Sequence, residues 1–136
     1  MRQTNVKQGA IRVIAGSTLT GKEGYLVKLA DNAGVANAYL PAALTDVAAY
    51  VVIEGAAAGS YCTIEPLEPG RRVRVVANSA TFVAGDKVVA YASGQEGKAT
   101  EYAGSGAAFC VGVAEETGDT AGQWLLIRPL LSYWTA

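Results

Sequence analysis

The stretch IRVIAGSTLTGKEGYLVKLA at residues 11–30 returns 62 positions later as VRVVANSATFVAGDKVVAYA at residues 73–92. A second pair of segments, GSYCTIEPL at 59–67 and GQWLLIRPL at 122–130, repeats at an offset of 63. A repeat of this length is evidence about the architecture of a chain and not about its function. We therefore expect a pseudo-symmetric fold made of two halves, about 11–67 and 73–130.

The pattern within each half is that of β-structure. Short runs rich in Val and Ile are separated by clusters of Gly, Asp, Asn and Ser, which form turns. Pro66 and Pro129 are expected to end equivalent strands, where a missing backbone donor does least harm. Only 41–47 (PAALTDV) favours a helical turn, because proline suits a helix start. The expected strands are 11–15, 25–30, 35–39, 49–54 and 61–66, then 72–77, 87–92, 99–102, 108–115 and 123–129.

These spacings predict an all-β fold, a compact β-barrel or β-sandwich built from the two halves. Residues 1–9 are polar and lack a period, so we expect an extended N-terminal arm. Residues 10–136 are expected to form a single β-domain. No leader or apolar run of spanning length is visible, which predicts a soluble product of the cytoplasm with no membrane partner.

The charges are nearly balanced, with 11 basic and 12 acidic residues. Proteins that bind nucleic acid usually carry a basic stripe, so no nucleic-acid partner is expected. The one basic cluster, Arg71, Arg72 and Arg74, is interpreted as a solvated turn and strand start. A local contact with an acidic partner is the alternative.

Few residues favour catalysis. Histidine is absent, which removes the commonest general base and metal ligand. The segment Gly16–Lys22 resembles a phosphate-binding loop, but Glu23 stands where a hydroxyl is needed and a strand follows in place of a helix, so we interpret it as a turn. Cys62 and Cys110 are interpreted as reduced, buried, small hydrophobic residues. The sequence therefore predicts no enzyme, no cofactor, no metal site and no small-molecule substrate.

Aromatic residues recur at equivalent places in the two halves: Tyr39 with Tyr102, and Tyr61 with Trp124. The recurrence favours a packing role in the core or between sheets. Tyr133 and Trp134 come after the last expected strand, so they are expected either to fold back onto the domain or to lie in a subunit interface.

The second half contains a series of short motifs: AGDKV at 84–88, GKA at 97–99, VGVAE at 111–115 and AGQWL at 121–125. The first half holds a looser copy, with GKEG at 21–24 where the second half has AGD at 84–86. In this pattern the chain resembles the small capsid decoration (cement) proteins of tailed bacteriophages.

This resemblance implies a structural virion protein, made in the host bacterial cytoplasm, that binds the outside of the capsid. Its implied partners are the major capsid protein, whose subunits it bridges and stabilises, and two further copies of itself in a homotrimer. We hypothesise that the N-terminal arm, through Arg2, Asn5 and Lys7, makes the capsid contact.

Two other classes of protein share the β-pattern. The first is another non-enzymatic virion module, such as a tail, baseplate or fibre-attachment protein. The second is a lipoyl or biotinyl carrier domain, which needs a lysine with fixed flanking residues at a hairpin tip. Lys98 after Gly97 has no such flanks.

Overall fold

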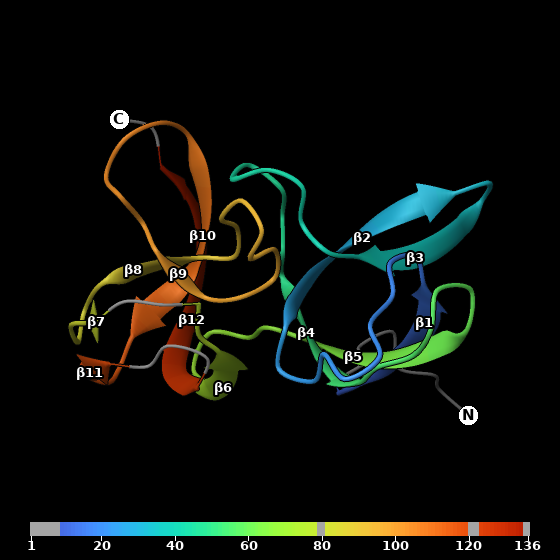
Figure 1. Cartoon of the computed structure of the whole chain (residues 1–136), viewed down its shortest axis with the longest axis horizontal. Coiled ribbons are helices and arrows are strands. Elements are labelled where there is room, and N and C mark those ends of the chain that lie inside the picture. The colour runs from blue at the N-terminus through green and yellow to red at the C-terminus, as the bar shows by residue number, and fades with distance from the viewer. Residues whose placement is uncertain (1–8, 79–80, 120–122, 135–136) are drawn as a thin grey trace, which may run out of the picture.

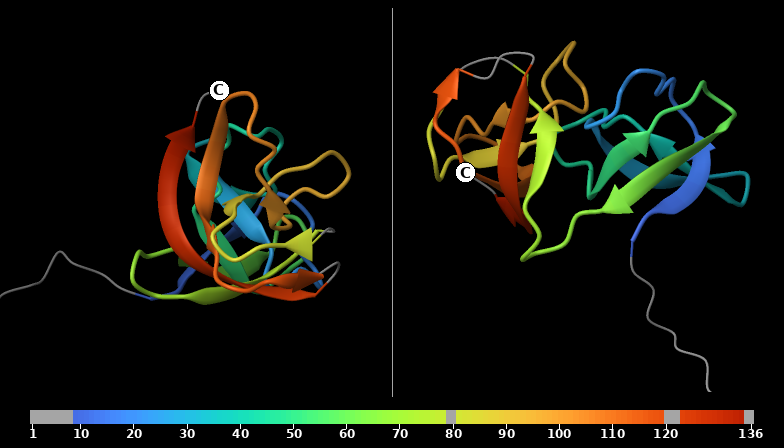
Figure 2. Two further views of the ribbon diagram at one scale, coloured as in Figure 1. Left: turned by 90° about the vertical axis from the view of Figure 1, so that its left-hand side faces the viewer. Right: turned by 90° about the horizontal axis from the view of Figure 1, so that it is seen from below.

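The computed structural model describes residues 9–78, 81–119 and 123–134, and within these ranges the chain forms twelve β-strands and no helix. Figures 1 and 2 show two lobes, one from each half of the chain. The strands of the first half are β1 (Ile11–Ala15), β2 (Leu26–Asn32), β3 (Val35–Tyr39), β4 (Tyr50–Glu54) and β5 (Tyr61–Pro66). Those of the second half are β6 (Val73–Val76), β7 (Thr81–Phe82), β8 (Lys87–Val89), β9 (Thr100–Glu101), β10 (Ala108–Ala114), β11 (Gly118–Asp119) and β12 (Trp124–Trp134).

The first half is a closed five-stranded barrel. Its strands follow the order β3, β2, β4, β5 and β1, all with antiparallel neighbours. A parallel pairing between β1 and β3 closes the ring, with Ala15 opposite Ala38. Closure leaves no free sheet edge in this half.

The second half repeats this order. Its sheet runs β9, β8, β10, β12 and β6, so each strand occupies the place of its sequence counterpart. Where β1 and β3 pair in the first half, the second has an isolated parallel bridge between Ala77 and Ala99, the counterparts of Ala15 and Ala38. The predicted duplication is therefore confirmed as two barrels of one topology, the second closed more loosely. A small extra pair, β7 with β11, was not expected from the sequence.

The interior of the first barrel is filled by one residue from nearly every strand. Leu19, in the loop after β1, is fully buried there, and Phe82 of β7 is fully buried in the second core. The buried set of the first barrel is Ala15, Leu19, Val27, Ala38, Val52, Cys62 and Ile64.

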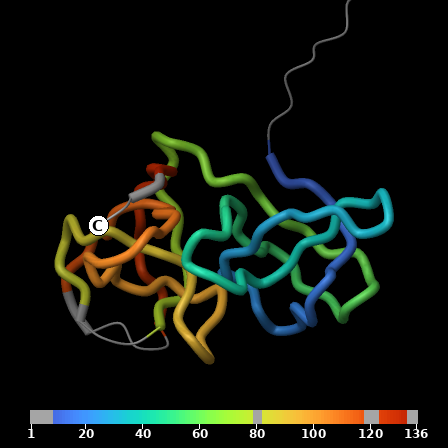
Figure 3. Tube along the Cα trace, turned by 90° about the horizontal axis from the view of Figure 1, so that it is seen from above, coloured from blue at the N-terminus to red at the C-terminus, as the bar shows by residue number. Residues whose placement is uncertain are grey.

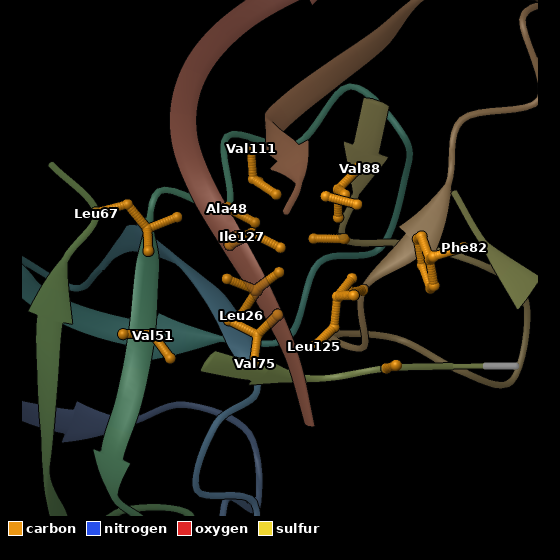
Figure 4. Packing of buried hydrophobic residues seen from close by; sticks show 14 of the residues in the cluster. Leu26, Ala48, Val51, Leu67, Val75, Phe82, Val88, Val111, Leu125 and Ile127 are labelled. Atoms are coloured by element: carbon orange, nitrogen blue, oxygen red, sulfur yellow. The ribbon is translucent and has the colours of Figure 1, made fainter. Parts of the chain in front are cut away.

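The second core extends beyond its own barrel. Leu26, Val51 and Leu67 lie on strands or strand ends of the first half, yet they pack with Val75 and Ile127 of the second (Figure 4). The outer face of the first barrel thus covers the interior of the second. The two halves share this apolar cluster.

Backbone hydrogen bonds also join the halves. Val76 N donates to the carbonyl of Gly24 at 3.0 Å, and Leu26 N donates to that of Gly97 at 2.7 Å. Phe109 N donates to the carbonyl of Leu44 at 2.7 Å. The segment between β5 and β6 crosses from one lobe to the other (Figure 3).

Two local expectations are wrong. Residues 41–47 form a turn and bends, not a helical turn, because the Asp46 carboxylate accepts the Ala42 N–H at 2.7 Å and the Lys28 ammonium at 2.8 Å. Pro129 does not end its strand, which runs on to Trp134. It lies opposite Gly112, where β10 shifts register, and a Cβ at Gly112 would lie 2.3 Å from the carbonyl oxygen of Arg128. A bulge and a glycine accommodate the proline within the strand.

Candidate functional site

The residues expected to contact a partner fall at the two ends of the chain. Arg2, Asn5 and Lys7 lie outside the described residues. Tyr133 and Trp134 were expected after the last strand, and this expectation is wrong. They are the last two residues of β12, where they pair with Phe109 and Ala108 of β10.

The recurring aromatic residues divide into two kinds. Tyr39 and Tyr102 are half-buried: the Tyr39 ring occupies the space beside Gly16, and the Tyr102 hydroxyl donates to the carbonyl of Gly106 at 2.7 Å. Tyr61 and Trp124 are 61% and 49% exposed. Neither side chain belongs to the apolar cluster of a barrel, so the expected role in the core is wrong for this second pair. The other expected role, packing between sheets, is seen for Trp124, whose ring lies against Gly24 of the first half. Alternation along β5 and β12 directs their neighbours Cys62 and Leu125 inward and these two aromatic side chains outward.

The exposed aromatic residues occupy matching positions in the strand pairing of the two halves. Tyr61 pairs with Ile14 across β5 and β1, and Trp124 pairs with Val76 across β12 and β6. Two residues before each aliphatic partner is an exposed arginine, Arg12 or Arg74. We call Arg12, Ile14 and Tyr61 the first patch, and Arg74, Val76 and Trp124 the second patch.

The two patches differ in their charge partners. In the first, the Arg12 guanidinium lies 6.0 Å from the centre of the Tyr61 ring and donates to Thr63 Oγ1 at 3.4 Å. In the second, Arg74 Nη1 forms an ion pair with Glu116 Oε1 at 2.7 Å. The arginine charge is thus balanced by a carboxylate in the second patch alone, as far as the described residues go.

The rest of the basic cluster behaves as a solvated surface, as expected. Arg71 forms ion pairs with Glu65 at 3.0 Å and Glu68 at 4.0 Å, and Arg72 is exposed. These side chains border a hollow of about 70 Å³ over Leu67 and other apolar residues at the junction of the halves. Drug-sized ligands occupy sites of roughly 300–1,000 Å³, so this hollow is too small for one.

The segment that resembles a phosphate-binding loop is a turn, as expected, with structural roles for its residues. Leu19 fills the first barrel, and the Glu23 carboxylate accepts the Gly55 N–H at 2.8 Å. The Lys22 ammonium lies 4.9 Å from the centre of the Tyr25 ring. No helix follows whose amides could bind a phosphate, since the next element is β2.

Both cysteines are free and buried, which confirms the expectation. Burial raises the pKa of the Cys62 thiol and that of the Cys110 thiol. Each therefore stays in the protonated form, which is a poor nucleophile.

Other chemical groups are dispersed. Within residues 9–78, 81–119 and 123–134, no three of the Cys, Asp and Glu side chains gather as a metal site would require. In the same ranges no helix could cross a membrane. Glu54 is the last residue of β4 and Glu115 follows the last residue of β10, and Glu115 Oε1 accepts a hydrogen bond from Arg128 Nε at 3.1 Å. Lys98 directs its ammonium toward the Tyr25 ring, 5.9 Å from its centre.

The sequence matches no protein-family model and no curated protein. The fold matches a solved structure, described as the head fiber gp8.5 N base in bacteriophage phi29, with a TM-score of 0.70 and 17% sequence identity. The match covers 96% of this chain and 100% of that one. At this identity the likeness establishes a common fold.

Proposed function

We propose that this protein is a non-enzymatic component of a bacteriophage virion that binds the exterior of the head as a decoration protein. The observation that carries the proposal is the likeness to a phage head fiber base, which extends over 96% of this chain and all of the other. It agrees with the family resemblance in the sequence.

The described surface supports a role in binding. It presents exposed apolar side chains on both barrels, among them Tyr61 and Trp124. The titratable groups of the described residues are engaged in ion pairs and turns or lie far apart, and the thiols are buried. A protein of this kind works by holding surfaces together, and many copies add avidity without strong single contacts.

The finer proposal is that each copy bridges major capsid subunits and stabilises the shell, as a homotrimer with Tyr133 and Trp134 in the subunit interface. The N-terminal arm, with Arg2, Asn5 and Lys7, makes part of the capsid contact. Trimerisation places three arms on one site, so that each later arm binds at high effective concentration.

The test is co-sedimentation with heads of the phage that encodes the protein, taken from a strain that lacks it. The complete chain is expected to coat the heads, and a chain without residues 1–9 is expected to remain a folded trimer in solution and to coat them poorly. Tails from the same phage are the control. Binding to tails and not to heads would contradict the proposal and favour a tail or baseplate module.

A second candidate is the base by which a fibre attaches to the head, and the description of the matching structure favours it. Both candidates predict head binding, so a second measurement separates them. A decoration protein raises the temperature at which heads release DNA, whereas a fibre base leaves that temperature unchanged.

A further inference from the structure

The first and second patches present the same combination of side chains twice. In each, an exposed aromatic residue lies opposite a half-buried aliphatic residue, and an exposed arginine stands two positions earlier on the aliphatic strand. Aromatic residues and arginine are enriched in protein interfaces and supply much of their binding energy.

Neither aromatic residue belongs to the buried apolar cluster of a barrel. Cys62 and Leu125, next to them in sequence, are fully buried and belong to the two cores. Tyr61 extends away from its core and remains 61% exposed. Trp124 is held at its inner edge, where its ring occupies the space beside Gly24, and still remains 49% exposed. The pair is therefore a feature of the surface.

The strands that carry the two patches run along one side of the molecule. In the view from below in Figure 2, β1 and β5 of one lobe and β6 and β12 of the other all run along the face turned to the viewer. One chain can therefore meet one extended surface with both lobes.

The distribution of charge in this chain indicates which charged groups the partner's surface carries. The first 22 residues contain four basic residues, Arg2, Lys7, Arg12 and Lys22, and no acidic one, whereas all twelve acidic residues follow from Glu23 on. Arg12, which lies on β1, forms no ion pair among the described residues. The edge of the first patch is thus cationic and complements a partner that offers carboxylates.

We propose that the two patches are duplicated docking sites that bind two copies of one element of the head shell, which presents an apolar contact to each patch and a carboxylate to Arg12 of the first patch. This rests on the proposed function and specifies how a single chain bridges shell subunits. Two linked sites make the second contact intramolecular, so the chain binds the assembled shell far more tightly than either patch does alone.

The experiment compares the unsubstituted chain with Tyr61→Ser, Trp124→Ser and the double variant in a titration of undecorated heads. Each single variant is expected to bind about 10-fold more weakly, a loss of about 1.4 kcal/mol, because aromatic residues are enriched among the few that dominate the binding energy of an interface. The double variant is expected to bind more weakly than either. Trp124→Leu keeps an apolar side chain over Gly24 and replaces Trp124→Ser if that variant does not fold. Thermal unfolding is measured for every variant.

Val83→Ser is the matched control, because Val83 is 54% exposed and belongs to neither patch. It is expected to bind like the unsubstituted chain. Arg12→Gln is expected to weaken binding and to reduce its dependence on salt. Folded Tyr61 and Trp124 variants that bind within twofold of the control would overturn the docking sites.

Bridging has its own readout. At saturating concentration a single-patch variant is expected to coat the heads without raising the temperature at which they release DNA. Full stabilisation by a single-patch variant would overturn the two-copy arrangement while leaving head binding in place. If the unsubstituted chain does not bind heads at all, the proposed function itself is wrong.

Discussion

Leu67 and Leu130 occupy the same position of the two repeats, yet Leu67 is 6% exposed and Leu130 is 50% exposed. Each follows the proline at the end of its repeated segment. The second barrel covers Leu67, whereas none of the described residues covers Leu130 to the same degree. The asymmetry arises because the first barrel packs its outer face onto the second and the second has no further barrel to pack against.

This asymmetry predicts unequal effects of the same substitution. Leu67→Ala is expected to lower the free energy of unfolding by about 2–4 kcal/mol, because it removes buried methyl groups and leaves a cavity between the halves. Leu130→Ala is expected to change it by less than about 0.5 kcal/mol. Denaturant unfolding measures both, and equal effects would contradict the packing of the two barrels.

Gly24 is expected to tolerate no side chain. Its φ is +85°, and a Cβ there would lie 2.2 Å from Cζ3 of Trp124. Gly24→Ala should therefore cost about 2 kcal/mol or more through backbone strain and steric overlap. Gly59→Ala is the control, because Gly59 has a similar φ of +90° with open space around it. If the two variants unfold at the same denaturant concentration, the contact with Trp124 contributes nothing.

Asp46 gives the stability a dependence on pH. Burial acts to raise the pKa of its carboxyl, but hydrogen bonds from Lys28 and the Ala42 N–H outweigh this effect and hold the pKa below its ordinary value of 3.8. The carboxylate therefore stabilises the fold above pH 3.8, and this contribution is lost as the pH falls further. Asp46→Asn is expected to cost about 1–2 kcal/mol at pH 7 and to lose less stability than the unsubstituted chain on acidification. An unchanged pH profile would contradict this role, and Glu101→Gln, at an exposed position, serves as the control.

The two thiols are expected to be unreactive in the folded protein. Burial raises the pKa of Cys62 and of Cys110, so iodoacetamide meets neither a thiolate nor an exposed sulfur. Mass spectrometry should find no alkylation under native conditions and two alkylated cysteines in concentrated guanidinium chloride. Rapid labelling of either thiol in the native protein would show that its barrel opens.

Much of the fold could be predicted from the sequence, because strand and turn signals are local. The bounds of β1, β3 and β5 match the expected ranges, and the five strands of the larger sheet in the second half begin within one residue of theirs. β8 and β9 are shorter than expected, and β12 continues through Pro129, because pairing partners decide where a strand ends. The Val-rich pattern alone does not show where those partners stop.

The candidate site was harder to predict. The repeat singles out Tyr61 and Trp124 as equivalent residues. Their recurrence alone favours a packing role and does not show that both side chains are exposed. Their exposure follows from the inward direction of Cys62 and Leu125, and alternation along the strands could have indicated it. The alignment of Arg12 with Arg74 in the two repeats is a further signal of these surface positions in the sequence.

The sequence by itself determined the duplication, the all-β class and the order of strands in each half, since these depend on residue patterns within about 60 positions of one another. Only the tertiary structure decided that the outer face of one barrel covers the interior of the other, so that Leu67 is buried and Leu130 is exposed. Contacts between two copies of the same pattern depend on which copy covers which. Long-range packing determines which repeat covers the other, and this cannot be read from any short segment of the sequence.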